Sequence, residues 1–579
     1  MTDLYAHSDR VKKIADEMTL EQLVGQTLVL GWTGAFPHRD VLESVEKYHP
    51  AGFRITPHGR KFGGYAQPGT ELYDKLCREP EPYERVYHTK AGEPRLTVAH
   101  YAEARNVVRR RSLETGAGIP CYFAHDQEGN TQSDTLDRHM VAFPHPMGIA
   151  QGGPELCRQV GRVVGRQLKS AGVDLTHGPV VDVNTDPHNP EISSRSYSPF
   201  PEVVGDCALQ TMLGFHENGL IATAKHFPGR GASNTDAHFS VPVIDESRER
   251  MEQIHLAPYR RLIAEGLPAI MLAHSIYPAL DPSEEISTVS RAIVTDLLRE
   301  QMGFEGVVMT DSFTMAGLVM KYDVAEGVVR SIEAGVDLIL LKDENALRGE
   351  AFGAIRDAVT QGRLSEERLR QSVLRTLTMK ERFGMLDEPF AMTDVDRMRK
   401  VHADPEHRTI ADTAAQKAVV CLRRQEGVFP FAEGKKVLVV EEPFGFMAEQ
   451  NNELAYCGSL YHALLERGID AHFTDYTTPD LDAAWDDIER LAALVDALVV
   501  TCHVRRGRQG PQDNTARFQS LGKPVVFVGN NPYPRLVPEN MQNVLVTFNT
   551  TARTMRMVAD VLTGRRQAGE LAFDPTRVY

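Results

Sequence analysis

Two ionisable side chains stand two residues apart in a polar stretch at residues 225–242, which reads KHFPGRGASNTDAHFSVP. They are Asp236 and His238, and the stretch around them is too polar and too rich in glycine for a core element. A histidine is a better-populated acid near neutral pH when a neighbouring carboxylate stabilises its charged form. The pair therefore indicates a proton donor, His238, oriented by Asp236, on a loop whose glycines let it approach and withdraw. On spacing alone, a plain surface turn explains the two residues equally well.

A third residue could act as a nucleophile. Asp311 directly follows the apolar run GVVMT at residues 306–310, which would mount its carboxylate on a rigid strand. Cleavage of a glycosidic bond needs a nucleophile on one face of the sugar and a proton donor near the leaving oxygen. Gly229 and Gly231 do not continue into a dinucleotide-binding fingerprint. We therefore expect Asp311 to attack a sugar and His238 to protonate the leaving group.

Eight short apolar runs are the elements that would position these residues. They are rich in aliphatic or β-branched residues and lie at residues 27–31, 52–56, 120–124, 173–176, 220–224, 269–273, 306–310 and 338–341. Helix-like stretches separate many of them, for example 154–171, 248–265, 293–302 and 325–334, and a capping-box pattern, TLEQ at 19–22, opens another. Eight strands alternating with helices predict an α/β fold, a (β/α)8 TIM-type barrel, over residues 1–384.

A second domain is expected after the barrel, because 579 residues exceed what one hydrophobic core usually supports. Residues 385–411 are rich in proline and charge and are interpreted as a linker. A second series of apolar runs follows at 437–440, 497–502, 524–528 and 544–548. This series predicts a smaller α/β sandwich domain with a mostly parallel sheet over residues 412–579.

Polar side chains follow most of the eight expected barrel strands. They are His125, Asp126, Gln127, Glu128, Asp182, Asn184, Arg195, Lys225, His226, His274, Asp311, Lys342 and Asp343. Each one alone could simply satisfy nearby backbone amides. Because barrel active sites are assembled at the carboxyl ends of the strands, the whole set indicates a functional site on one face. Many charged donors and acceptors without a nucleotide-binding loop suit a polyhydroxylated substrate.

The same region carries a family resemblance. The segments KHFPGRGASNTDAH, HDQEG, VVDVNTDPHNPEISSRSYS, LAHSIYPALD and GFEGVVMTDSFTMAGL occur at barrel-compatible spacing. Together they closely resemble family 3 glycoside hydrolases, specifically the two-domain β-N-acetylhexosaminidase branch, over roughly residues 20–383.

The resemblance implies a retaining, exo-acting β-glycosidase, most specifically a β-N-acetylhexosaminidase, that works through a glycosyl-aspartate intermediate. It implies Asp311 as nucleophile and His238, paired with Asp236, as acid/base. The expected sugar-binding residues are Asp126, Arg195, Lys225, His226, His125 and His274. No cofactor and no metal are expected.

Several alternatives stay open. Some members of the branch use phosphate as acceptor, so a glycoside phosphorylase is one, and a glycosidase for a different, anionic terminal sugar is another. A metal-dependent barrel hydrolase and an inactive sugar-binding protein are more distant rivals. The long segment after the second expected strand, residues 57–96, is predicted to wall the leaving-group side, with a solvated insertion or an oligomer contact as its competing interpretation.

Composition limits the partners. Asp and Glu outnumber Lys and Arg by 79 to 64, and the net charge of −15 argues against a dedicated binder of nucleic acid or of an anionic membrane. Seven scattered cysteines fit a reducing compartment, and the N-terminus carries no signal-peptide pattern, so a cytoplasmic location is expected. A carbohydrate is the expected partner, and a homodimer is an open alternative.

Overall fold

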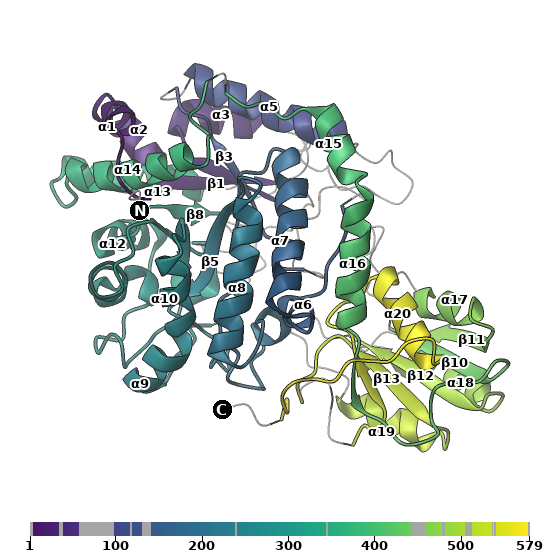
Figure 1. Cartoon of the computed structure of the whole chain (residues 1–579). Coiled ribbons are helices and arrows are strands. Elements are labelled where there is room, and N and C mark those ends of the chain that lie inside the picture. Colours follow the sequence, from purple (N-terminus) through teal and green to yellow (C-terminus); the bar gives the residue numbers. More distant parts are fainter. Residues whose placement is uncertain are drawn as a thin grey trace.

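The computed structural model describes most of the chain (Figure 1). The described residues are 4–33, 37, 39–56, 98–115, 118–129, 140–237, 240–342, 346–388, 390–442, 458–476, 481–503, 512–534, 537 and 540–576. None of the helices in these ranges combines the length and the hydrophobicity that a membrane-spanning helix needs.

The first sheet is a parallel barrel. Its strands are β1 (Leu28–Thr33), β2 (Gly52–Thr56), β3 (Tyr122–His125), β4 (Leu175–Thr176), β5 (Ile221–Phe227), β6 (Ala269–Leu272), β7 (Val307–Thr310) and β8 (Ile339–Leu341). The strand order is β7-β6-β5-β4-β3-β2-β1-β8. Backbone hydrogen bonds from Thr310 to Leu338 (3.0 Å) and from Phe313 to Leu340 (2.9 Å) join β7 to β8 and close the ring. The predicted barrel is confirmed.

Helices surround the barrel strands. They are α1 (Asp9–Asp16), α2 (Leu20–Gly25), α3 (Arg39–Tyr48), α5 (Val98–Thr115), α6 (Pro146–Ala150), α7 (Gly153–Ser170), α8 (Pro201–His216), α9 (Arg248–Arg250), α10 (Ala257–Ala264), α11 (Ala316–Val319), α12 (Val324–Ala334), α13 (Leu347–Thr360) and α14 (Glu366–Arg382). The expected helices near 248–265 and 293–302 contain π-helical turns, η3 (Met251–His255) and η5 (Ala292–Gln301). Short 3₁₀ turns are η2 (Ser193–Arg195) and η4 (Ser287–Val289). The capping box at Thr19 and Gln22 forms as expected.

Side chains of the strands alternate between two apolar clusters, as the pleat requires. Inward-facing residues such as Tyr122 and Ala124 fill the barrel, whereas Phe123 packs outward under the helices. The alternation decides which polar side chains reach the barrel interior.

The segment 385–411, expected as a linker, holds α15 (Val395–His402) and the first half of α16 (Pro405–Lys417). Helix α16 packs against α7 of the barrel and against α20 of the second domain (Figure 1). The connection between the two domains is therefore largely helical. The domain limits at 384 and 412 stay predictions.

The second domain is a three-layer α/β sandwich. Its strands are β9 (Val420–Arg423), β10 (Lys436–Glu441), β11 (Asp470–Asp475), β12 (Ala497–Cys502), β13 (Val525–Gly529) and β14 (Val544–Val546). They run in the order β11-β10-β12-β13-β14-β9, all parallel except β9. Helices α17 (Ser459–Leu465) and α20 (Ala552–Leu562) cover one face, and α18 (Leu481–Ala492) and α19 (Gln512–Ser520) cover the other. The predicted mostly parallel sheet is confirmed, and β9 and β11 are additions to it.

Candidate active site

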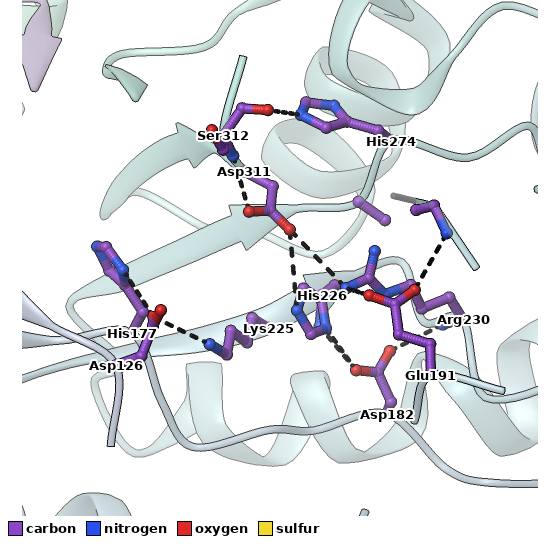
Figure 2. Close-up of polar contacts among 12 residues, drawn as sticks. Asp126, His177, Asp182, Glu191, Lys225, His226, Arg230, His274, Asp311 and Ser312 are labelled. Carbon is purple, nitrogen blue, oxygen red and sulfur yellow. Dashed lines mark hydrogen bonds and ion pairs between the residues drawn. The ribbon is translucent and has the colours of Figure 1, made fainter. Parts of the chain in front are cut away.

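Asp311 follows the last residue of β7, so its carboxylate stands at the carboxyl end of the barrel. Its Oδ1 accepts a hydrogen bond of 2.7 Å from the backbone N–H of Ser312. Its Oδ2 lies 3.9 Å from His226 Nε2 and 3.8 Å from Arg230 Nη2 (Figure 2). The side chain is 17% exposed. Asp311 is thus a largely buried carboxylate, with one oxygen held by the backbone and the other beside an imidazole and a guanidinium.

His226 lies in β5 and is oriented by a buried carboxylate. Its Nδ1 is 2.7 Å from Asp182 Oδ2, and Asp182 also accepts hydrogen bonds from the backbone N–H groups of His226 (3.2 Å) and Arg230 (2.8 Å). Burial, followed by the nearby cations Arg230 and Arg195, lowers the pKa of His226 well below its ordinary value. The ring is therefore neutral at pH 7, and with Asp182 ionised its Nε2 presents a lone pair toward Asp311.

Glu191 connects Arg230 to the loop that carries the expected proton donor. Its Oε1 lies 2.9 Å from Arg230 Nη2, and its Oε2 accepts a hydrogen bond of 3.3 Å from the backbone N–H of Ala237. The carbonyl of Ala237 in turn accepts a hydrogen bond of 3.0 Å from Gly317 N–H. Asp236, next in the chain, is buried. These contacts fix the described start of the loop against the nucleophile's surroundings.

Asp126 is the centre of a second polar cluster, at the end of β3. Its Oδ2 lies 2.6 Å from Arg54 Nη2 and 3.8 Å from Lys342 Nζ. Its Oδ1 lies 3.1 Å from His177 Nδ1 and 3.5 Å from Lys225 Nζ (Figure 2). Burial would raise the pKa of the Asp126 carboxyl, but Arg54, Lys225 and Lys342 outweigh it and hold the pKa well below its usual range. Asp126 is an ionised acceptor suited to sugar hydroxyls.

Glu128 joins this cluster to Arg195. The guanidinium of Arg195 binds Glu128 in a fork, at 2.6 Å through Nε and 3.0 Å through Nη2, and Lys225 Nζ lies 2.5 Å from Glu128 Oε1. Burial would raise the pKa of Glu128, yet Arg195 and Lys225 together lower it to about 2. Arg195 is 6% exposed on its side chain, so it braces Glu128 more than it reaches the pocket.

Five of the residues expected in the site are brought together by the structure. They are Asp311, His226, Lys225, Asp126 and Arg195. His274 contacts the residue that follows Asp311: its ring lies 3.1 Å from the carbonyl of Ser312 (Figure 2) and 2.7 Å from Thr288 Oγ1. It steadies the residue after Asp311. His238, Asp343 and the segment 57–96 lie outside the described residues, so the assigned role of His238 stays a prediction.

His125 does not join the cluster, and its assignment as a sugar-binding residue is corrected. It is the last residue of β3 and fully buried, with its Nε2 3.2 Å from Arg105 Nη2 on α5. Because Ala124 faces the barrel interior, the next side chain faces outward.

The glycines of the loop also have a packing role, which was not expected from the sequence. A Cβ on Gly231 would lie 1.7 Å from the carbonyl oxygen of Val183, and one on Gly229 would lie 3.0 Å from the side chain of His255. Gly229 also has a φ of +116°. These glycines permit close packing of the loop.

Several residues of the polar network were not among the site residues expected from the sequence. They are Arg54, Glu128, His177, Asp182, Glu191 and Arg230. Asp182 and Glu128 were noted only as strand-end carboxylates. Arg54 had a readable signal, because it is a cation within an otherwise apolar strand. Glu191 and Arg230 had none, since each lies in an irregular segment and only the fold brings them together.

Comparison with known proteins identifies the class. Residues 91–379 match the glycosyl hydrolase family 3 N-terminal domain. A beta-hexosaminidase of Nitrosomonas eutropha is 32% identical over 263 residues, which is 44% of this chain and 75% of that protein. The chain therefore belongs to glycosyl hydrolase family 3, as the motifs predicted.

Further similarities point to one branch of that family. Beta-hexosaminidase A of Pseudoalteromonas piscicida is 28% identical over 356 residues, and the match spans 58% of each chain. A solved family 3 beta-N-acetylglucosaminidase from Paenibacillus sp. str. FPU-7 aligns with a TM-score of 0.77 at 25% identity, covering 97% of this chain and 99% of that one. A beta-glucoside phosphorylase shares the fold, with a TM-score of 0.79 at 19% identity over 99% of this chain and 98% of that one. The sequence match to the hexosaminidase thus spans somewhat over half of the chain, whereas the fold similarity extends over nearly all of it and includes both the N-acetylglucosaminidase and the phosphorylase.

Proposed function

We propose that the protein is a β-glycosidase that releases terminal N-acetylglucosamine or a closely related sugar. The observation that carries this proposal is the carboxylate of Asp311 at the tip of β7, with one oxygen facing both His226 Nε2 and Arg230 Nη2. The names of the Nitrosomonas and Paenibacillus relatives support the sugar.

The proposed reaction is a double displacement. Asp311 attacks the anomeric carbon to form a glycosyl ester, while His238, oriented by Asp236, donates a proton to the leaving oxygen. The same imidazole then removes a proton from water, which attacks the ester and regenerates Asp311. Two inversions give net retention of the β configuration.

The remaining groups prepare the site for these steps. Arg230 stabilises the negative charge of Asp311 and helps to orient it, since the guanidinium lies 3.8 Å from the carboxylate. His226 Nε2 and Asp126 are acceptors for sugar hydroxyls, and Lys225 is a donor. Preorganised donors and acceptors of this kind bind the charge distribution of the transition state without reorganisation.

A panel of p-nitrophenyl glycosides, assayed with and without phosphate, tests the proposal. We expect hydrolysis of the 2-acetamido β-glucoside with the β anomer as the first product, seen by NMR. Asp311→Asn should reduce turnover by about 10⁴-fold or more, whereas Asp486→Asn on the exposed face of α18 should leave it unchanged. Wild-type activity in Asp311→Asn would overturn the assignment. A sugar phosphate formed in phosphate buffer would assign the acceptor as phosphate.

A further inference from the structure

The polar network divides into two halves of opposite charge among the described side chains. The half around Asp311 holds one cation, Arg230, and the carboxylates Asp182, Glu191 and Asp311. The half around Asp126 holds four cationic side chains and two carboxylates, which are Arg54, Lys225, Lys342, Arg195, Asp126 and Glu128. The Asp126 half therefore has an excess of two positive charges.

Glu191 does not change this conclusion. It lies 3.7 Å from Arg195 as well as 2.9 Å from Arg230, so it could be counted with either half. Counted with the Asp126 half, it still leaves that half positive. The described side chains around Asp126 thus favour an anionic group of a ligand, and the described side chains around Asp311 do not.

Exposure identifies which members of the positive half can reach a ligand. The side chains of Arg54, Lys225 and Arg195 are 0%, 4% and 6% exposed, respectively. Lys342 is 13% exposed and Asp126 is 22% exposed. Arg54 also donates from Nη1 to the carbonyl of Ile55 and to Thr56 Oγ1, so it is held in place by its own strand. Buried cations therefore offset the charge of Asp126, and Lys342, 3.8 Å from it, is the most exposed of the four cations.

We propose that this end of the pocket binds a negatively charged substituent on the terminal sugar, with Lys342 as its direct contact. The inference rests on the proposed function. In a pyranose whose anomeric carbon is at Asp311, the substituents at C4 and C5 point to the opposite end of the ring. Asp126 would accept a hydroxyl there, and the Lys342 ammonium would pair with the anion on the neighbouring position. A carboxylate, a sulfate ester and a phosphate ester share this chemistry.

Matched aryl glycosides test the inference. The p-nitrophenyl 2-acetamido β-glucoside is compared with its 6-sulfate and its 6-phosphate, and the p-nitrophenyl β-glucoside with the β-glucuronide. We expect kcat/KM of the wild-type protein to be about 10- to 100-fold higher for at least one anionic sugar than for its neutral partner. The glucuronide tests for recognition of a carboxylate, and the 6-sulfate and 6-phosphate test for recognition of an anionic ester. The KM of the preferred anionic sugar should rise with ionic strength.

Variants of Lys342 assign the contact. Lys342→Met should lower the ratio of anionic to neutral kcat/KM by about 10- to 100-fold, mainly through KM, and Lys342→Arg should largely restore it. Lys321→Met at an exposed position near α12 should not change the ratio. Equal losses on both sugar types would overturn the assignment of Lys342.

Two outcomes separate this inference from the proposed function. Cleavage of neutral glycosides with every anionic partner slower overturns the inference alone. If no glycoside is cleaved, the proposed function fails, and calorimetric titration of the wild-type protein with glucuronate, N-acetylglucosamine 6-phosphate and N-acetylglucosamine still tests the preference. Tighter binding of a neutral sugar than of its anionic partners would refute it. The same titration decides the matter if Lys342→Met does not fold.

Discussion

Glu191 Oε2 accepts a hydrogen bond of 3.3 Å from the backbone N–H of Ala237, the residue between Asp236 and His238. The other oxygen of Glu191 pairs with Arg230 at 2.9 Å, and Arg230 lies 3.8 Å from Asp311. One buried carboxylate therefore links the start of the donor loop to the surroundings of the nucleophile. Loss of the Glu191 carboxylate should therefore disturb the placement of the proton donor, His238, more than that of the nucleophile, Asp311.

We expect Glu191→Gln to slow the cleavage of poor leaving groups more than that of activated ones. If the amide oxygen still accepts from Ala237, the amide NH2 faces the Arg230 guanidinium, and this contact between two donors pushes the side chain and the attached loop away from Arg230 and Asp311. The loss in kcat should be about tenfold for an alkyl glycoside. A plot of kcat against leaving-group pKa measures it, with Glu202→Gln at the exposed start of α8 as control. A uniform loss across the series would argue against a role in placing the donor.

The buried carboxyl of Asp182 should make the free energy of unfolding depend on pH, and its pKa shift fixes the direction. Burial, opposed by Arg230, raises the pKa of the Asp182 carboxyl to about 6, against about 3.9 in an unfolded chain. The folded state thus binds this proton more tightly, and the contribution to stability is full below about pH 4 and is lost as the pH rises through about 6. Asp182→Asn should therefore gain stability relative to wild type by up to about 3 kcal/mol between pH 4 and pH 7. Urea denaturation at several pH values measures the difference, and a constant difference would contradict the prediction.

The same titration should shape the activity profile. A protonated Asp182 donates to His226 Nδ1, which moves the ring proton to Nε2 and removes the acceptor that faces the pocket. We expect kcat/KM to fall below about pH 6 in the wild-type protein. In Asp182→Asn this side chain no longer titrates, so kcat/KM should lack this acid limb. A limb retained near the same pH in the variant would assign it to another group.

Glu128→Gln should destabilise the fold itself. The carboxylate is buried between Arg195 and Lys225, which hold its pKa at about 2, so its contribution is full above about pH 4.5 and is lost as the pH falls through 2. Removing the charge leaves two buried cations with less compensation, at a cost of about 3–5 kcal/mol at pH 7. The urea midpoint measures this cost, with Glu155→Gln on the exposed side of α7 as control. A change below 1 kcal/mol would mean that water already screens the pair.

The sequence predicted the fold well where hydrophobic runs were long and regular. Strands β2 and β12 lie at the expected residues, and β5 continues beyond the expected end at residue 224 to Phe227. Strand β9 was not predicted because it is short and only partly buried. Strand β11 was not predicted because polar residues alternate through it. The β11 sequence lacks the continuous apolar run by which buried parallel strands are recognised, whereas residues 418–422 around β9 do form one.

The candidate site was predictable to the extent that strand ends define it. Asp311, Asp126 and Lys225 follow from the barrel alone, since their strands end on one face. His125 was misassigned because position after a strand does not say which face a side chain takes, whereas the alternation from Ala124 does. Glu191 could not be found, because its partners Arg230 and Ala237 are some forty residues away and meet it only in the folded chain.

Asn531 should transmit the second domain's position to the site. It follows β13, and its Nδ2 lies 2.5 Å from Ser193 Oγ, two residues before Arg195. The backbone N–H of His145, whose ring contacts Ser194 Oγ at 2.8 Å, also donates to the carbonyl of Phe548 at 2.9 Å. Both contacts join the second domain to the segment that positions Arg195.

We expect Asn531→Ala to raise KM for glycosides by about three- to tenfold while lowering the free energy of unfolding by only about 1 kcal/mol. The lost hydrogen bond lets Ser193 move and loosens the fork between Arg195 and Glu128, whereas most of the domain interface remains. Asn531→Asp should restore KM, because the Ser193 hydroxyl can donate to the carboxylate. Asn540→Ala, at an exposed position of the same domain, is the matched control. A KM unchanged in Asn531→Ala would show that the barrel positions Arg195 without help from the second domain.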